Sequence, residues 1–182
     1  MERRTVLKLL AAGVLAERLE AAQHHLAAIA QTPTAYKLQF FPAAQNELLD
    51  RLTELILPAD DRSPGAHEAK VSLFVDVMVA ASRKDVQQQW AAGLKTVEAE
   101  SQKRFTRPFL KLNTGEQDQI LQAMVAHEGS PINDLERFFA LLKSMTINGY
   151  YTSSVGIHRD VQYKGNTALP EYPGCTHSEH RT

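Results

Sequence analysis

Apolar side chains recur at helical spacing over almost the whole stretch from Pro42 to Gly149, and this periodicity constrains the fold more than any other feature. Strand-like alternation of useful length is absent, and the pair Asn148-Gly149 stands at a predicted helix end rather than between β-branched runs. Helices are expected at about 42–57, 71–78, 86–105, from 114 onward and at 130–149. The sequence therefore predicts an all-α fold, a single compact bundle of about five helices.

Local signals refine these helices. Thr114 and Gln117 fit a capping box at the start of the fourth helix, and Ser130-Pro131 fits a side-chain cap followed by proline in the first turn of the fifth. The second helix is apolar on two faces, which predicts a place inside the bundle. Its apolar residues are Val71, Phe74, Val75 and Met78 on one face, and Leu73 and Val77 on the other.

Composition limits the class of protein. A chain of 182 residues with 43% hydrophobic and 23% charged residues resembles an average soluble domain, and such a chain buries about 70% of the surface that its unfolded form exposes. Its core therefore needs no metal or disulfide. The 20 basic and 21 acidic residues give a net charge of -1, so the basic surface that phosphate binding requires is missing. Nucleic acid is not an expected partner.

The first thirty residues are typical of an export signal. Arg3, Arg4 and Lys8 precede and enter a modestly apolar run at 6–16, as in twin-arginine signals, and 28–30 offers a small-x-small cleavage pattern. The run is too short to span a membrane. We expect a signal at 1–30, a single helical domain at 31–182, no transmembrane span and a periplasmic location. The alternative is an amphipathic helix that belongs to the fold, and cleavage stays open.

The C-terminal tail is irregular and rich in Tyr, Pro and Gly. This composition suits an interface, because Tyr offers a large contact area and has few rotatable bonds that binding must immobilise. The alternative is a tail that folds back over the bundle. The predicted partner-contacting residues are Tyr150, Tyr151, Tyr163, Gly165, Asn166, Tyr172 and Pro173.

The sequence contains no motif for a cofactor. Rossmann and phosphate-binding glycine patterns and the haem attachment motif are absent, and one Cys cannot hold an iron–sulfur cluster. Metal ligation at 175–180 or calcium binding at Asp60 and Asp61 is weakly indicated, and a loop in which Asp or Ser caps the next helix is the simpler interpretation. Surface or capping roles are expected for His67 and His127.

A nucleophile and a base are present near the end of the fifth helix. Ser153, Ser154, His158 and Asp160 are residue types that suit acyl transfer, but a triad is recognised by geometry and not by proximity in sequence. A small hydrolase is therefore an alternative function, and packing or turn roles are the competing interpretation.

Cys175 is the single cysteine. In an exported protein an unpaired cysteine indicates either a disulfide to another chain or a free thiol, and both readings stay open here.

The chain resembles the small subunit of the gluconate 2-dehydrogenase type, also called subunit 3 or the gamma subunit. The matching features are the twin-arginine start, 57–61 running into 63–66 with Asp60, Asp61 and Gly65, the Glu68-Ala69 helix opening, and the segments 163–166 and 172–174. Their order and spacing cover most of the chain beyond the signal. Glu2 and the charged stretch 17–25 depart from the usual signal pattern.

The resemblance implies a non-catalytic subunit without a cofactor of its own. Its partner would be a large FAD-dependent sugar or polyol dehydrogenase, often with a multihaem cytochrome c as a third chain, and the complex could be held at the membrane. It also implies a cross-link from Cys175 to the catalytic subunit. Because twin-arginine export carries folded proteins, a chain of this kind would supply the export signal for a flavoprotein that lacks one. An independent periplasmic binding or scaffold protein is the main alternative.

Overall fold

The fold is taken from a computed structural model, which describes residues 36–163 and 165. All described helices belong to the second of two units into which the chain divides, 38–182. They are α2 (Ala43–Ile56), α3 (Val71–Ala80), α4 (Lys84–Phe105), α5 (Thr114–Val125) and α6 (Asp134–Tyr151), with short helices η1 (Phe109–Lys111) and η2 (Gly156–Asp160). The described residues form helices and no strands, which confirms the all-α prediction.

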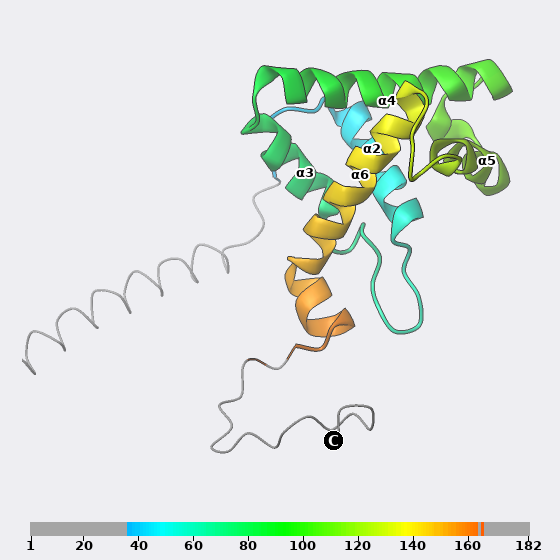
Figure 1. Cartoon of the computed structure of the whole chain (residues 1–182). Coiled ribbons are helices and arrows are strands. Elements are labelled where there is room, and N and C mark those ends of the chain that lie inside the picture. Colours follow the sequence, from blue (N-terminus) through cyan, green and yellow to red (C-terminus); the bar gives the residue numbers. More distant parts are fainter. Residues whose placement is uncertain (1–35, 164, 166–182) are drawn as a thin grey trace, which may run out of the picture. The chain divides into compact units, whose positions relative to one another are not determined.

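Helix α6 contacts all four of the other long helices, and α2 also packs against α3. Figure 1 shows α4 running across the bundle, with α3 beneath one end and α5 beneath the other. This arrangement leaves the loop between α2 and α3 and the C-terminal end of α6 on the side away from α4.

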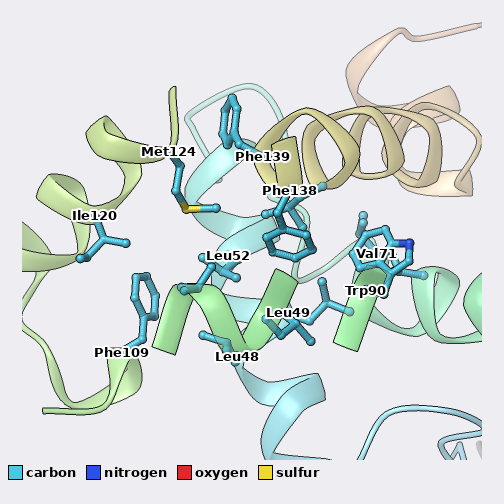
Figure 2. Packing of buried hydrophobic residues seen from close by; sticks show 14 of the residues in the cluster. Leu48, Leu49, Leu52, Val71, Trp90, Phe109, Ile120, Met124, Phe138 and Phe139 are labelled. Atoms are coloured by element: carbon cyan, nitrogen blue, oxygen red, sulfur yellow. The ribbon is translucent and has the colours of Figure 1, made fainter. Parts of the chain in front are cut away.

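Aromatic rings fill the middle of the core, where α2, α4 and α6 meet (Figure 2). Trp90 is fully buried, and the Phe138 ring packs edge-on against it with centroids 5.6 Å apart. Phe41, which precedes α2, also packs edge-on against Trp90, with ring centroids 6.2 Å apart. These contacts join α4, α6 and the segment before α2.

The helix starts differ from the predicted ones. Asn113, not Thr114, caps α5, and its capping box is completed by Glu116 rather than Gln117. Helix α6 begins at Asp134 with Asn133 as its cap, three residues after the predicted Ser130. Both caps are Asn residues next to other good capping residues, so the spacing alone left several possible starts.

Helix α3 is less buried than predicted. Val77 is 39% exposed and Met78 is 42% exposed, so one side of the helix is open among the described residues.

Within the part of the chain that the structure describes, no helix combines the length and the apolar character needed to cross a membrane. The predicted export signal lies outside the described residues.

Candidate functional site

The loop between α2 and α3, residues 57–70, projects from the helices and is held at many points (Figure 1); we call it the braced loop. Its base is closed by a hydrogen bond of 2.9 Å from the Ala66 amide to the Leu57 carbonyl. The first part, from Pro58 to Arg62, is exposed, whereas Pro64 to Ala66 is buried. The tip is therefore presented to solvent on a fixed base.

Glu54 on α2 anchors the loop from inside. Its two carboxylate oxygens accept hydrogen bonds from the amides of Ala59 at 3.1 Å and His67 at 2.8 Å. Gly65 passes so close that a Cβ atom at this position would lie 2.3 Å from both oxygens. A side chain at Gly65 would displace the carboxylate, which gives a physical reason for the predicted structural role of this glycine.

Asp50, one turn earlier on α2, links the loop to α3. Its Oδ2 lies 2.5 Å from Nδ1 of His67, and its Oδ1 accepts a hydrogen bond of 2.8 Å from the Ser72 hydroxyl. The serine thus contacts the carboxylate and not the imidazole, so the three side chains do not have the order of a catalytic triad. The hydrogen bond to Asp50, followed by its negative charge, raises the pKa of His67.

This contact makes a testable prediction about pH. Because the folded protein holds the proton on His67 more tightly, the contact stabilises the loop fully below the ordinary pKa of 6.5 and ceases to do so as the pH rises through the raised value. In a titration followed by NMR, Asp50→Asn should lower the His67 midpoint. Asp61→Asn, which removes an exposed charge from the same loop, should leave it in place. Equal midpoints in the wild type and Asp50→Asn would contradict the assignment.

The end of α6 braces the far side of the loop. Tyr150 is 2% exposed, and its hydroxyl donates a buried hydrogen bond of 2.6 Å to the carbonyl of Pro64. Arg159 in η2 forms an ion pair with Glu68. The predicted interface residue Tyr150 therefore has an internal, structural contact in this chain.

The acidic pair in the loop has two different environments. Asp60 Oδ1 accepts hydrogen bonds of 2.7 Å from the amides of Arg62 and Ser63, and these bonds lower the pKa of Asp60. This is a side-chain turn that shapes the tip, as expected for a structural loop. Asp61 is exposed. Asp60 does not cap the next helix, because α3 begins only at Val71 and follows Lys70 without a side-chain cap.

A second anchoring carboxylate lies on α3. Asp76 is fully buried and accepts hydrogen bonds from three successive amides, those of Gln39 at 2.7 Å, Phe40 at 3.0 Å and Phe41 at 2.8 Å. Asp76 therefore fixes the segment that leads into α2. Sequence reasoning missed this residue, although a lone carboxylate in an otherwise apolar helix was a signal that could have found it.

A groove of about 440 Å³ opens where this segment, α2 and α3 meet. Leu38, Ala43 and Leu73 supply apolar walls, and Asp50 and His67 stand at its polar side. The groove also includes Asn46, whose Oδ1 is buried and has no hydrogen-bond partner among residues 36–163 and 165.

The residues considered for hydrolysis are engaged in a turn. The Ser153 hydroxyl donates to the Tyr150 carbonyl at 2.6 Å and accepts from the Gly156 amide at 3.0 Å, while His158 is exposed. Burial, followed by the charge of Asp160, raises the pKa of Tyr151. Among the described residues, no group of three or more His, Cys, Asp or Glu side chains is placed to hold a metal ion.

Other predicted site residues divide between exposed positions and positions outside the described part. Tyr151, the last residue of α6, is exposed, and so are Tyr163 and Gly165 beyond the helix. His127, expected at the surface or in a cap, lies 2.9 Å from Glu136 at the start of α6, and this contact is the first cause of the lowered pKa of Glu136. The predicted site residues that lie outside the described part of the chain are Arg3, Arg4, Lys8, Asn166, Tyr172, Pro173 and Cys175.

Comparison with known proteins identifies the family. No curated protein and no solved structure matches this chain. The family model described as gluconate 2-dehydrogenase subunit 3 matches residues 43–168, which is more than half of the chain and includes the braced loop and all the described long helices. The chain therefore belongs to the gluconate 2-dehydrogenase subunit 3 family.

Proposed function

We propose that this chain is the non-catalytic small subunit of a periplasmic, FAD-dependent sugar or polyol dehydrogenase complex. Membership in a family of dehydrogenase subunits carries the proposal. The polar contacts of the braced loop also support it, because Asp50, Glu54 and Tyr150 are all engaged in holding the loop in place. Such a chain acts by binding: it presents a fixed surface to the catalytic flavoprotein and stabilises its folded form.

The N-terminal sequence supports a second part of the proposal, a role in export. Arg3, Arg4 and Lys8 fit a twin-arginine signal, and that route carries folded proteins. The small subunit would accompany a flavoprotein that has already bound FAD and lacks a signal of its own. A multihaem cytochrome c could complete the complex and hold it at the membrane. Cys175 would form a disulfide with the catalytic chain, which non-reducing electrophoresis of the wild-type and Cys175→Ser complexes would reveal.

The decisive experiment looks for a gene for a flavin-dependent dehydrogenase next to the gene for this chain, expresses that enzyme with and without the chain, and measures dye-linked sugar oxidation in periplasmic and cytoplasmic fractions. We expect periplasmic activity only with the wild-type small subunit. Replacing Arg3 and Arg4 together by Lys should leave the activity in the cytoplasm, because the paired guanidinium groups of the signal are lost while the positive charge remains. Arg18→Lys, outside the motif, is the matched control. Periplasmic activity without the small subunit would refute the export role.

A further inference from the structure

The outer part of the braced loop is an excursion that the chain does not need in order to connect α2 to α3. Its ends are already joined, because the Ala66 amide donates to the Leu57 carbonyl at 2.9 Å, and residues 58–65 lie between them. Surface loops of about 6–16 residues with ends as close as these are frequently functional. The excursion therefore requires an explanation other than chain connection.

The excursion is ordered by helices on two sides, although its outer part adds little to the core. Glu54 on α2 holds the Ala59 amide, and the Tyr150 hydroxyl on α6 holds the Pro64 carbonyl. Residues 58–62 are exposed, so buried apolar surface does not offset the entropy cost of fixing them, about 1–2 kcal/mol per residue. A segment that is ordered before binding loses less entropy when it binds, which favours a role in recognition.

The tip of the loop offers side chains rather than backbone to a partner. The Asp60 amide donates to the Ser63 carbonyl at 2.9 Å, and Asp60 Oδ1 accepts from the amides of Arg62 and Ser63. These bonds occupy the amides that an added strand would use. Asp61 and Arg62 are exposed, and neither side chain forms a hydrogen bond or an ion pair with residues 36–163 or 165. The tip thus carries adjacent negative and positive groups on a fixed backbone.

The end of α6 and the short helix η2 lie beside the loop. Arg159 in η2 pairs with Glu68 of the loop, and Figure 1 shows the end of α6 and the loop on the side away from α4. Three side chains near this end are strongly exposed: Tyr151 at 43%, Val161 at 57% and Tyr163 at 49%. Apolar contact area is therefore available next to the charged tip.

The length of chain beyond η2 indicates which partner reaches this end of the bundle. Cys175 is ten positions beyond Gly165, and ten residues span at most about 35 Å. A catalytic subunit joined to Cys175 must come within that distance of Gly165. This constraint favours the end of the bundle that carries η2 and the braced loop.

We propose that the tip of the braced loop is the docking element for the catalytic flavoprotein subunit, and that it enters a recess with a cation facing Asp61 and a carboxylate facing Arg62. This inference rests on the proposed function, because it names the part of the chain that performs the binding. The two opposed charges set the orientation of the partner, and the exposed side chains beside η2 add apolar contact area.

Cross-linking identifies what contacts the tip. Cys175 is the single cysteine, so the full chain with Cys175→Ser and Asp61→Cys carries one thiol, which is labelled with a benzophenone maleimide in the complex with the flavoprotein. Illumination should give an adduct of this chain with the flavin-containing subunit. Asp118→Cys, at an exposed position of α5, is the matched control and should give no such adduct. Equal yields at the two positions would overturn the proposal. An adduct between two copies of this chain, or one within a chain to residues 166–182, would also overturn it.

A competition experiment measures the contribution of the two charges and keeps Cys175. Wild-type chain and an Asp61→Arg/Arg62→Asp chain carry different tags and are co-expressed with a limiting amount of the flavoprotein. The wild type should capture about tenfold more flavin per chain, because the exchange opposes like charges in the recess. The control exchange, Lys111→Asp/Asp118→Arg, uses exposed residues away from the loop and should compete within about twofold of the wild type.

The competition also separates failure of the surface from failure of the proposed function. Equal capture by the wild-type chain and the Asp61→Arg/Arg62→Asp chain, with unchanged helicity, would remove the tip from the interface. If the wild type captures no flavoprotein at all, the proposed function itself fails.

Discussion

Replacing Asp76 by Ala should lower the free energy of unfolding by about 3 kcal/mol. The carboxylate is fully buried and accepts three backbone hydrogen bonds, and each bond to a charged group contributes about 1.5–3 kcal/mol. The expected loss is smaller than the sum of three such contributions, because Gln39 is exposed and its amide can bond to water instead. The Phe41 amide has no such substitute, since Phe41 is 2% exposed.

Urea denaturation of the wild type and the variant measures this change, and a loss of about 3 kcal/mol corresponds to a fall in Tm of about 6–12 °C for a chain of this size. The stability of Asp76→Asn should lie between those of the wild type and Asp76→Ala, because the amide oxygen of Asn can still accept hydrogen bonds but carries no charge. Asp118→Ala, which removes an exposed carboxylate from α5, is the control and should change stability by less than about 0.5 kcal/mol. A similar small change in Asp76→Ala would show that the three amides do not depend on this carboxylate.

The sequence predicted the helices well because their apolar spacing is unambiguous. Leu48, Leu49 and Leu52 are buried as their stripe on α2 predicted, and Trp90, Leu94 and Val97 are buried on α4. In a long helix, apolar residues spaced three or four positions apart all lie on the side that packs against the core. The apolar periodicity is therefore enough to locate these helices in the sequence. The family resemblance, confirmed by the family model, rested on the twin-arginine start and on motifs in the braced loop and the tail.

Periodicity failed at α3, where the apolar residues are not confined to one face. Spacing shows which residues share a face but not which face meets the rest of the bundle. The orientation of α3 is set by its two polar residues, Ser72 and Asp76. Ser72 bonds to Asp50, 22 positions away, and Asp76 bonds to residues 39–41, which are 35–37 positions away. Contacts at such separations depend on tertiary structure, so the local sequence could not reveal them. The same reason hid the pairing of Asp50 with His67.

Gly93→Ala should destabilise the protein by about 2–3 kcal/mol. This is the opposite of the intrinsic effect, because a helix by itself favours Ala over Gly by about 1 kcal/mol. Gly93 lies in α4 where it crosses α6, and a Cβ atom there would lie 2.0 Å from Cδ2 of Phe138. The ring has little space into which it can move, because Phe138 is 3% exposed and packs edge-on against Trp90. The two helices would have to separate, which disrupts the centre of the core.

Gly115→Ala is the matched control for this substitution, because Gly115 also lies in a helix, α5, and a Cβ atom there meets only Asn113 Oδ1 at an ordinary 3.5 Å. Thermal unfolding should show a lower Tm for Gly93→Ala and an equal or higher Tm for Gly115→Ala, so the two changes of the same chemistry should have opposite signs. Phe138→Leu should recover part of the loss in the Gly93→Ala background, since the smaller side chain vacates the contact, and a double-mutant cycle measures this coupling. Additive effects of the two substitutions would mean that the glycine is required for some reason other than the approach of Phe138.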